Sequence, residues 1–149
     1  MAVAEPIVRS RISLAEFAQL PEGPPDYEYE RGELIEMPRP HPRHNGLAAF
    51  LFTFLDAHVR QNRLGRVFLD SLVAVLPDVV YAPDVFFIAR EGAAEYDPES
   101  GQVTGPPDLV VAVLSPRGGE ARDRVGKFEV LPGGGSGVVL DHRSDGARG

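Results

Sequence analysis

The sequence predicts an α/β protein in which a mixed central sheet is flanked by helices. Three observations carry this prediction. A long helical pattern of apolar residues lies between 47 and 59, runs rich in Val, Phe and Leu follow it, and a second helical pattern precedes a short final strand. Helices and strands in this order pack as a sheet covered by helices rather than as a bundle or a sandwich.

A short helix and a β-hairpin are expected before the long helix. Ser13 is a candidate N-cap, and Glu16 stands three residues later, as in a capping box. The segment YEYERGELIEM then places Arg31 and Gly32 between two short segments of β character. Because glycine tolerates the positive φ of a tight turn, we predict a hairpin over residues 26–37.

The long helix leads into three predicted strands. Gly65 follows the apolar pattern and is the expected C-terminal cap of the helix. The runs RVFLDSLVAVLPD and VVYAPDVFFIAR are separated by a Pro-Asp turn and predict two paired strands. Residues 91–107 are polar and predict a surface loop, which leads into a third strand at 108–114.

The C-terminal part combines a modest helix with a flexible joint. Apolar residues at helical spacing between 121 and 128 predict the helix, although Gly126 interrupts it. The segment GGGSG then predicts a flexible connection to a short strand, GVVLD. We predict one domain over 1–149, with the N-terminal helix and hairpin at 13–37, the core at 44–131, and the glycine-rich joint, strand and tail at 132–149.

Composition excludes several classes of protein. With 149 residues and 43% hydrophobic content, the chain is expected to form one compact core. No run approaches the roughly 20 apolar residues that cross a bilayer, and the first residues lack the pattern of a signal peptide. We therefore expect a cytoplasmic protein with no membrane partner.

Any bound metal is expected to have oxygen ligands. The absence of cysteine excludes disulfides and thiolate zinc sites. The four histidines do not form the HExxH spacing that places two ligands on one helical face.

Charge is unevenly distributed along the chain. The net charge of -7 argues against broad electrostatic attachment to nucleic acid. Residues 41–66 nevertheless contain four arginines and a single acid, whereas residues 67–115 contain eight acids and a single arginine. The basic segment is either a local contact face or the solvated side of a helix.

Two aspartates enter apolar strands directly after a proline. Asp84 stands in APDVFFI and Asp108 stands in PPDLVV. A carboxylate at the start of a buried strand needs a cation, backbone hydrogen bonds or a metal, because an unpaired buried charge is costly. If neighbouring strands bring both acids together, they suit Mg²⁺, which prefers oxygen ligands. Alternatively, each acid caps a turn.

Three further residues are candidates for a site. Lys127 is the only lysine of the chain, although it could also form an ordinary helical ion pair with Asp123. Glu28 lies in the first strand of the hairpin, where most of the acids are expected to face water. His44, near the start of the long helix, is either a surface or capping group or a substrate contact.

These segments in order resemble a known family. YEYERGELIEM, PHPRH before a long helix, APDVFFI, PDLVVAVLSP and a helix containing lysine resemble the bacterial restriction-endonuclease-like proteins of the PD-(D/E)xK nuclease superfamily. The resemblance covers residues 13–141. It implies a restriction-endonuclease-like fold and a Mg²⁺-dependent endonuclease that acts on DNA phosphodiesters.

Site residues follow from that resemblance, with one departure. It implies Asp84 and Lys127 as catalytic residues, and Asp84, Asp108 and Glu28 as metal ligands. Position 112, where the family usually has its second acid, is Ala112, and the segment around GGGSG also departs from the family pattern. The alternative is a pseudo-nuclease that binds nucleic acid or protein without cleavage. DNA and a second copy of the chain are the candidate partners.

Overall fold

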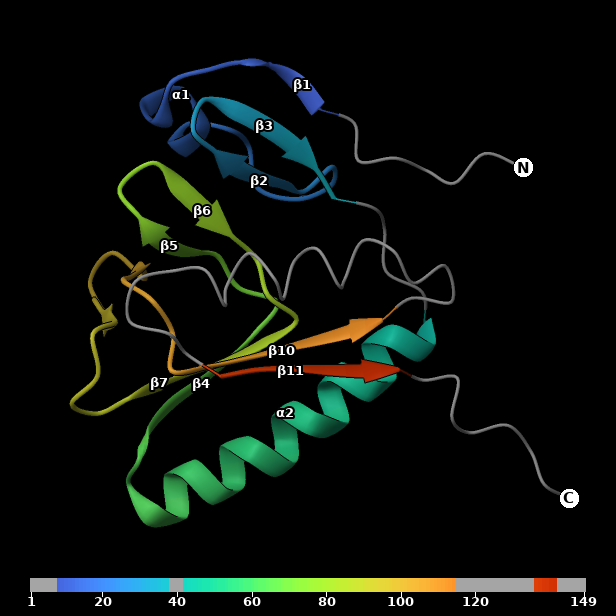
Figure 1. Cartoon of the computed structure of the whole chain (residues 1–149), viewed down its shortest axis with the longest axis vertical. Coiled ribbons are helices and arrows are strands. Elements are labelled where there is room, and N and C mark those ends of the chain that lie inside the picture. The colour runs from blue at the N-terminus through green and yellow to red at the C-terminus, as the bar shows by residue number, and fades with distance from the viewer. Residues whose placement is uncertain (1–7, 38–41, 115–135, 142–149) are drawn as a thin grey trace, which may run out of the picture.

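The computed structural model describes residues 8–37, 42–114 and 136–141, which form two β-sheets and two helices (Figure 1). The elements are β1 (Val8–Arg11), α1 (Leu14–Ala18), β2 (Tyr27–Glu30), β3 (Glu33–Glu36), α2 (Pro42–Asn62), β4 (Gly65–Leu69), β5 (Val73–Leu76), β6 (Val79–Tyr81), β7 (Val85–Ala89), β8 (Glu95–Tyr96), β9 (Val103–Thr104), β10 (Leu109–Leu114) and β11 (Ser136–Asp141).

The N-terminal helix and hairpin form as their local sequences predict. The Ser13 hydroxyl accepts a hydrogen bond from the Glu16 amide, and the Glu16 carboxylate accepts one from the Ser13 amide, which completes a capping box. β2 and β3 pair antiparallel around Arg31 and Gly32, whose φ angles are 48° and 91°. Both turn residues therefore adopt the left-handed conformation that a two-residue hairpin turn requires.

A four-stranded sheet with the order β11-β10-β7-β4 forms the part of the molecule next to α2 (Figure 1). β10 pairs parallel with β11 and antiparallel with β7, so the sheet is mixed. Side chains from α2, β4, β7 and β10 form an apolar cluster between helix and sheet, with Ala48, Val59, Val67, Val85 and Val111 among its buried members. The predicted mixed α/β class is confirmed.

A seven-stranded sheet with the order β1-β3-β2-β6-β5-β9-β8 forms the rest of the described chain. A second apolar cluster joins the two sheets, because Val73, Val79 and Tyr81 of this sheet pack with Phe86 and Ile88 of β7. Alternate residues of β7 thus face different clusters: Val85 packs toward α2 and Phe86 packs toward the other sheet.

The two runs between residues 66 and 90 pair with each other as predicted, but each is divided into two strands. This segment forms four strands, of which β4 and β7 pair in one sheet while β5 and β6 pair in the other. Asp70 separates β4 from β5 with a φ of 44°, and its amide donates to the Asp84 carbonyl oxygen. Few residues other than glycine adopt a left-handed conformation, and although Asp is enriched among them, its presence alone does not predict a break there.

The predicted loop and helix cap also need correction. The polar segment after β7 contains two short strands, β8 and β9, and Ala94 and Val103 from it are buried. Gly65 is the first residue of β4 and does not cap α2. Arg63 takes that role with a φ of 52°, in a Schellman arrangement where Leu64 donates to the Val59 carbonyl.

The C-terminal predictions are tested only in part. The expected strand at GVVLD is confirmed as β11. The predicted helix that contains Lys127 lies outside the described residues. In the part of the chain that the structure describes, no helix has the length and apolar content to span a bilayer.

Candidate active site

The Asp84 carboxylate is the centre of the candidate site. Its Oδ2 atom accepts a hydrogen bond of 2.7 Å from the Val113 amide, and its Oδ1 atom lies 3.1 Å from Nε2 of His44. The side chains of Asp84 and His44 are only 12% and 15% exposed. Polar contacts in such a shielded position are strong, so together they fix the orientation of the carboxylate.

Three elements position this carboxylate. Asp84 lies at a bend directly before β7, His44 lies in the first turns of α2, and Val113 lies near the end of β10. The Asp84 side chain takes the place of a backbone carbonyl at this end of the β7–β10 pair, because it accepts from an amide of the neighbouring strand. The site is thus built where the start of α2 meets one end of the sheet.

Ala112 lies beside Asp84. The β7–β10 register ends with Val111 opposite Val85, so Ala112 and Asp84 are the next residues of the two segments. Ala112 is 5% exposed, so a buried methyl group occupies the position where the family resemblance predicts an acid.

His44 belongs to the site, although its sequence position left a surface or capping role open. It is separated from Asp84 by forty residues, and the fold alone brings the two together. The signal that pointed to it was its place at the start of the long helix, in the PHPRH segment. Because its imidazole contacts the carboxylate, His44 is a positioning residue for Asp84.

Glu28 is close to the same segment of chain. It is 4% exposed, and it is the buried charged residue of the described part of the molecule. Its Oε1 atom accepts a hydrogen bond of 2.9 Å from the amide of Ala82, two residues before Asp84. Burial raises the pKa of the neighbouring Tyr81 phenol, and the carboxylates of Glu30 and Glu28 raise it further.

Asp108 lies at the other end of the β7–β10 pair. Its Oδ2 atom accepts a hydrogen bond of 2.6 Å from the Ala89 amide, and its own amide donates to the Phe87 carbonyl. In this register Asp108 is about four residues from the Asp84 end, or roughly 13 Å at ~3.3 Å per residue. The expectation that Asp108 joins Asp84 at one metal is therefore corrected.

The reason for this separation is the direction of the strands. Each acid stands at the start of its strand, and β7 and β10 run antiparallel. The starts of antiparallel neighbours lie at opposite ends of the pair. The two Pro-Asp segments would have converged only if the strands were parallel.

The donor chemistry of the remaining acids fits a hard divalent cation, but the ligand set is small. Asp84 and Glu28 supply oxygen donors, and Mg²⁺ is often held by one or two carboxylates with water in its other positions. Within residues 8–37, 42–114 and 136–141, no group of three or more His, Asp or Glu side chains is placed to hold a metal. Lys127 lies outside these ranges, so its catalytic role stays a prediction.

The fold is mixed α/β, and comparisons with known proteins identify the family of the chain. A family model named Uma2, with the description "Putative restriction endonuclease", matches residues 14–132. The chain therefore belongs to the Uma2 family.

A solved structure gives independent support for the fold. It is the crystal structure of a protein from Anabaena variabilis ATCC 29413 with the description "putative nuclease belonging to DUF820". This chain is similar to it with a TM-score of 0.69 and 24% sequence identity, over 87% of this chain and 74% of that one. Among curated proteins, none matches.

Proposed function

We propose that this protein is a nuclease-like domain whose Asp84 site is built for Mg²⁺-dependent hydrolysis of DNA phosphodiesters, and that Ala112 impairs cleavage. One observation carries the proposal. The Asp84 carboxylate is held by His44 and by the amide of Val113, the residue directly after the buried Ala112. The family membership of the chain supports the reaction class.

Each residue of the site has a separate task. Asp84, with Glu28 on the neighbouring sheet, would hold the ion, which when bound polarises the phosphate and lowers the pKa of a coordinated water. The Val113 amide fixes one carboxylate oxygen of Asp84, and His44 fixes the other. Lys127, if its helix packs over the site, would stabilise the negative charge that develops on the phosphate.

The alanine at position 112 weakens this arrangement in two ways. It removes a carboxylate ligand, and it removes a negative charge that would attract a divalent cation. The remaining two acids give a site with low affinity for Mg²⁺ and imprecise placement of the attacking water. We therefore expect little cleavage from the natural sequence.

Restoring an acid tests the proposal. Ala112→Glu is expected to raise plasmid cleavage in Mg²⁺ or Mn²⁺ by at least about 10-fold, because it returns a ligand beside Asp84. Ala112→Gln is the matched control, since it has nearly the same shape without the charge. Ala112→Asp provides a shorter acid if Glu is poorly accommodated at this buried position.

Two measurements show whether an inactive variant is folded. Circular dichroism and denaturant unfolding establish that each variant is folded. If folded wild type, Ala112→Glu and Ala112→Asp all leave plasmid intact, the proposed catalytic function is wrong.

A second candidate function is binding without cleavage. It is favoured by Ala112 and by the cluster of Arg60, Arg63 and Arg66 around the end of α2. If this surface binds DNA through phosphate contacts, retention should fall as salt rises, and both Arg60→Ala and Arg63→Ala should weaken it. A lack of DNA retention at low salt would exclude this candidate.

A further inference from the structure

The outer face of α2 carries two phenylalanine side chains that are exposed to solvent. Phe50 is 66% exposed and Phe54 is 74% exposed, the highest values among the large apolar side chains of the described residues. Their rings stack, with centroids 6.4 Å apart and 23° between the ring planes. The opposite side of the helix packs on the four-stranded sheet through Ala48 and Val59, and α2 lies at the outside of the molecule (Figure 1). Exposed apolar side chains that occur singly are common, whereas an adjoining pair on one helix indicates an interaction surface.

The side chains around the two rings are small and uncharged. Gly46, Thr53 and Ala57 are exposed, and each lies one helical turn from one of the rings. With the two phenylalanines they form a surface that we call the α2 stripe. The Thr53 hydroxyl donates a hydrogen bond of 2.8 Å to the Ala49 carbonyl, so its burial would leave no polar group unsatisfied. A β-carbon at position 46 would meet nothing within 4 Å, so there is space there for a ring from a partner.

The charges of the chain favour a second copy of it as the partner of the stripe. The net charge is -7, so two copies repel each other over most of their surfaces. α2 contains one acid, Asp56, whose two carboxylate oxygens accept hydrogen bonds of 3.0 and 2.9 Å from Nε of Arg60. The stripe itself carries no charge. Two stripes can therefore meet without bringing unpaired acids together.

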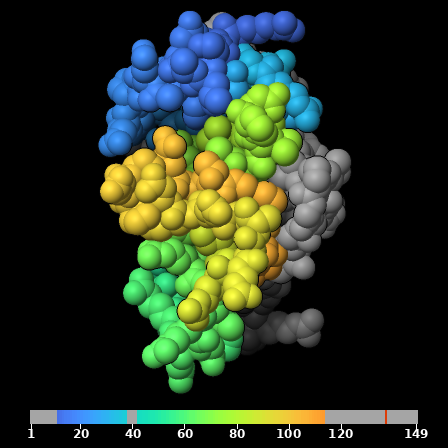
Figure 2. Space-filling model, turned by 90° about the vertical axis from the view of Figure 1, so that its left-hand side faces the viewer, coloured from blue at the N-terminus to red at the C-terminus, as the bar shows by residue number. Residues whose placement is uncertain are grey.

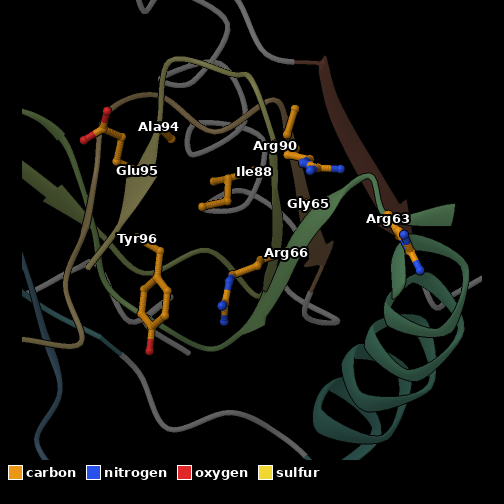
Figure 3. A pocket seen from close by; sticks show the side chains of 9 residues that line it. Arg63, Gly65, Arg66, Ile88, Arg90, Ala94, Glu95 and Tyr96 are labelled. Carbon is orange, nitrogen blue, oxygen red and sulfur yellow. The ribbon is translucent and has the colours of Figure 1, made fainter. Parts of the chain in front are cut away.

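The surface beyond the end of α2 is positively charged and limits the stripe. A hollow of about 480 Å³ lies there, bordered by Arg63, Arg66 and Arg90 among others (Figure 3). These side chains extend in different directions, and the Arg66 guanidinium lies over the Tyr96 ring, 4.8 Å from its centroid. Figure 2 shows this part of the surface, where the green α2–β4 connection adjoins the yellow segment after β7. The three arginines do not converge on one point, and the apolar contact surface is confined to α2.

The stripe is self-complementary under a two-fold rotation. α2 spans Pro42–Asn62, so residue 52 is its midpoint. Phe50 lies two residues before this midpoint, and Phe54 lies two residues after it. If a second α2 packs antiparallel across an axis at the midpoint, Phe50 of each copy lies against Phe54 of the other. Such a contact is isologous, which is the arrangement found in two-fold homodimers.

The area of the stripe suits a dimer that forms and dissociates. At roughly 200 Å² for a fully exposed phenylalanine, Phe50 and Phe54 together offer roughly 280 Å² in each copy. Two copies would therefore bury roughly 560 Å² of ring surface, and the small residues of the stripe would add to it. Specific interfaces start near ~1,000 Å² in total, and those at the low end are weak. The contact is thus too small for an obligate dimer.

We propose that two copies of this chain form a reversible homodimer in which their α2 stripes pack antiparallel, with Phe50 of each copy against Phe54 of the other. The candidate active site lies to one side of this contact. His44 is eight residues before the midpoint of α2, or roughly 12 Å along the helix at ~1.5 Å per residue. The dimer does not depend on cleavage at Asp84, so this proposal and the proposed function can fail separately.

Sedimentation velocity of the full chain over a range of concentrations tests the proposal. The wild type is expected to shift from monomer to dimer as its concentration rises. Phe50→Ala and Phe54→Ala should each weaken dimerisation by at least about 10-fold, because each removes two rings from one interface. Both positions are exposed and alanine favours a helix, so the variants should stay folded. Leu72→Ala is the matched control: Leu72 is 49% exposed but lies between β4 and β5, so its truncation should leave dimerisation unchanged.

Single cysteines test the two-fold arrangement, since the chain has none of its own. Gly46 lies six residues before the midpoint of α2 and Ala57 lies five residues after it, so an antiparallel dimer brings position 46 of one copy next to position 57 of the other. Like positions would be roughly 15 Å or more apart along the helix, whereas a disulfide needs Cα atoms within about 7 Å. A mixture of Gly46→Cys and Ala57→Cys should therefore form disulfide-linked dimers under mild oxidation, and neither variant alone should do so.

Three results would overturn the proposal. The first is a monomer at every concentration, and a loss of single-stranded DNA retention in Phe54→Ala would then assign the stripe to nucleic acid. The second is a dimer that Leu72→Ala weakens as much as Phe54→Ala, or that neither phenylalanine substitution weakens, which would place the contact elsewhere. The third is a mixture of the two cysteine variants that forms no more disulfide-linked dimer than either variant alone, which would exclude the antiparallel arrangement.

Discussion

Asp84 and Asp108 begin from the same local sequence and have different surroundings. Each follows a proline, stands at the start of an apolar strand, and accepts a hydrogen bond from an amide of the neighbouring strand, Val113 for Asp84 and Ala89 for Asp108. The two acids thus cap opposite ends of one strand pair. Asp84 also contacts His44, whereas Asp108 is packed against the backbone of Gly92.

This difference separates a structural requirement from a chemical one. A carboxylate that caps a strand pair stabilises the fold wherever it stands, because it satisfies a partly buried amide. At Asp84 the same cap lies beside a histidine, and its amide donor, Val113, directly follows Ala112, where the family resemblance predicts a second acid. We infer that both carboxylates stabilise the fold through these hydrogen bonds. Only Asp84 has further neighbours that suit a catalytic role.

The largest expected effect is on cleavage. In the Ala112→Glu background, Asp84→Asn should lower plasmid cleavage by at least about 100-fold, because a removed metal ligand costs more than the 10–100-fold loss typical of an outer partner. Asp108→Asn should leave cleavage within about threefold once the folded fraction is taken into account. Equal losses of cleavage from the two substitutions would show that the two acids act together. They would contradict a purely structural role for Asp108.

A smaller effect is expected on stability at the Asp108 end. A β-carbon at position 92 would lie 2.6 Å from Oδ2 of Asp108, so Gly92→Ala should lower the free energy of unfolding by about 1–3 kcal/mol. Gly46→Ala in α2 is the control, since a β-carbon there meets nothing within 4 Å and alanine favours the helix by up to about 1 kcal/mol.

A double-mutant cycle tests whether the Asp108 carboxylate causes the loss of stability in Gly92→Ala. In the Asp108→Ala background the collision is gone, so Gly92→Ala should cost much less than in the wild type. Denaturant unfolding of the four proteins gives the coupling free energy. If Gly92→Ala lowers the free energy of unfolding equally in both backgrounds, the strain lies in the backbone around Gly92 rather than at the Asp108 carboxylate.

Elements specified by neighbouring residues could be predicted from the sequence. The capping box at Ser13 and Glu16 and the turn at Arg31 and Gly32 depend on contacts within a few residues, and both form as expected. The breaks inside residues 66–90 depend on Asp70, a non-glycine residue in a left-handed conformation. Such a conformation is imposed by packing between the two sheets, so the local sequence did not reveal it.

In the candidate site, contacts between residues far apart in the sequence could not be predicted either. The sequence identifies Asp84 and Glu28 as candidate acids, and the structure places Asp84 in the segment whose Ala82 amide donates to Glu28. Whether Asp108 joined them depended on the relative direction of β7 and β10, which residue type and spacing do not encode. The contact of His44 with Asp84 could not be predicted for the same reason, because it exists only after α2 has packed on the sheet.

His44 gives the smallest and most specific test of the contrast. His44→Ala should lower the free energy of unfolding by about 1 kcal/mol, because a shielded hydrogen bond to Asp84 is lost while the Val113 bond remains. In the Ala112→Glu background it should also lower cleavage by about 10-fold, as expected for an outer partner that orients a ligand. His44→Gln, which keeps a side-chain N–H donor, should recover part of both losses. If His44→Ala lowers stability but leaves the cleavage rate of the folded fraction unchanged, the histidine is a second structural cap, and Asp84 would resemble Asp108 more closely than we propose.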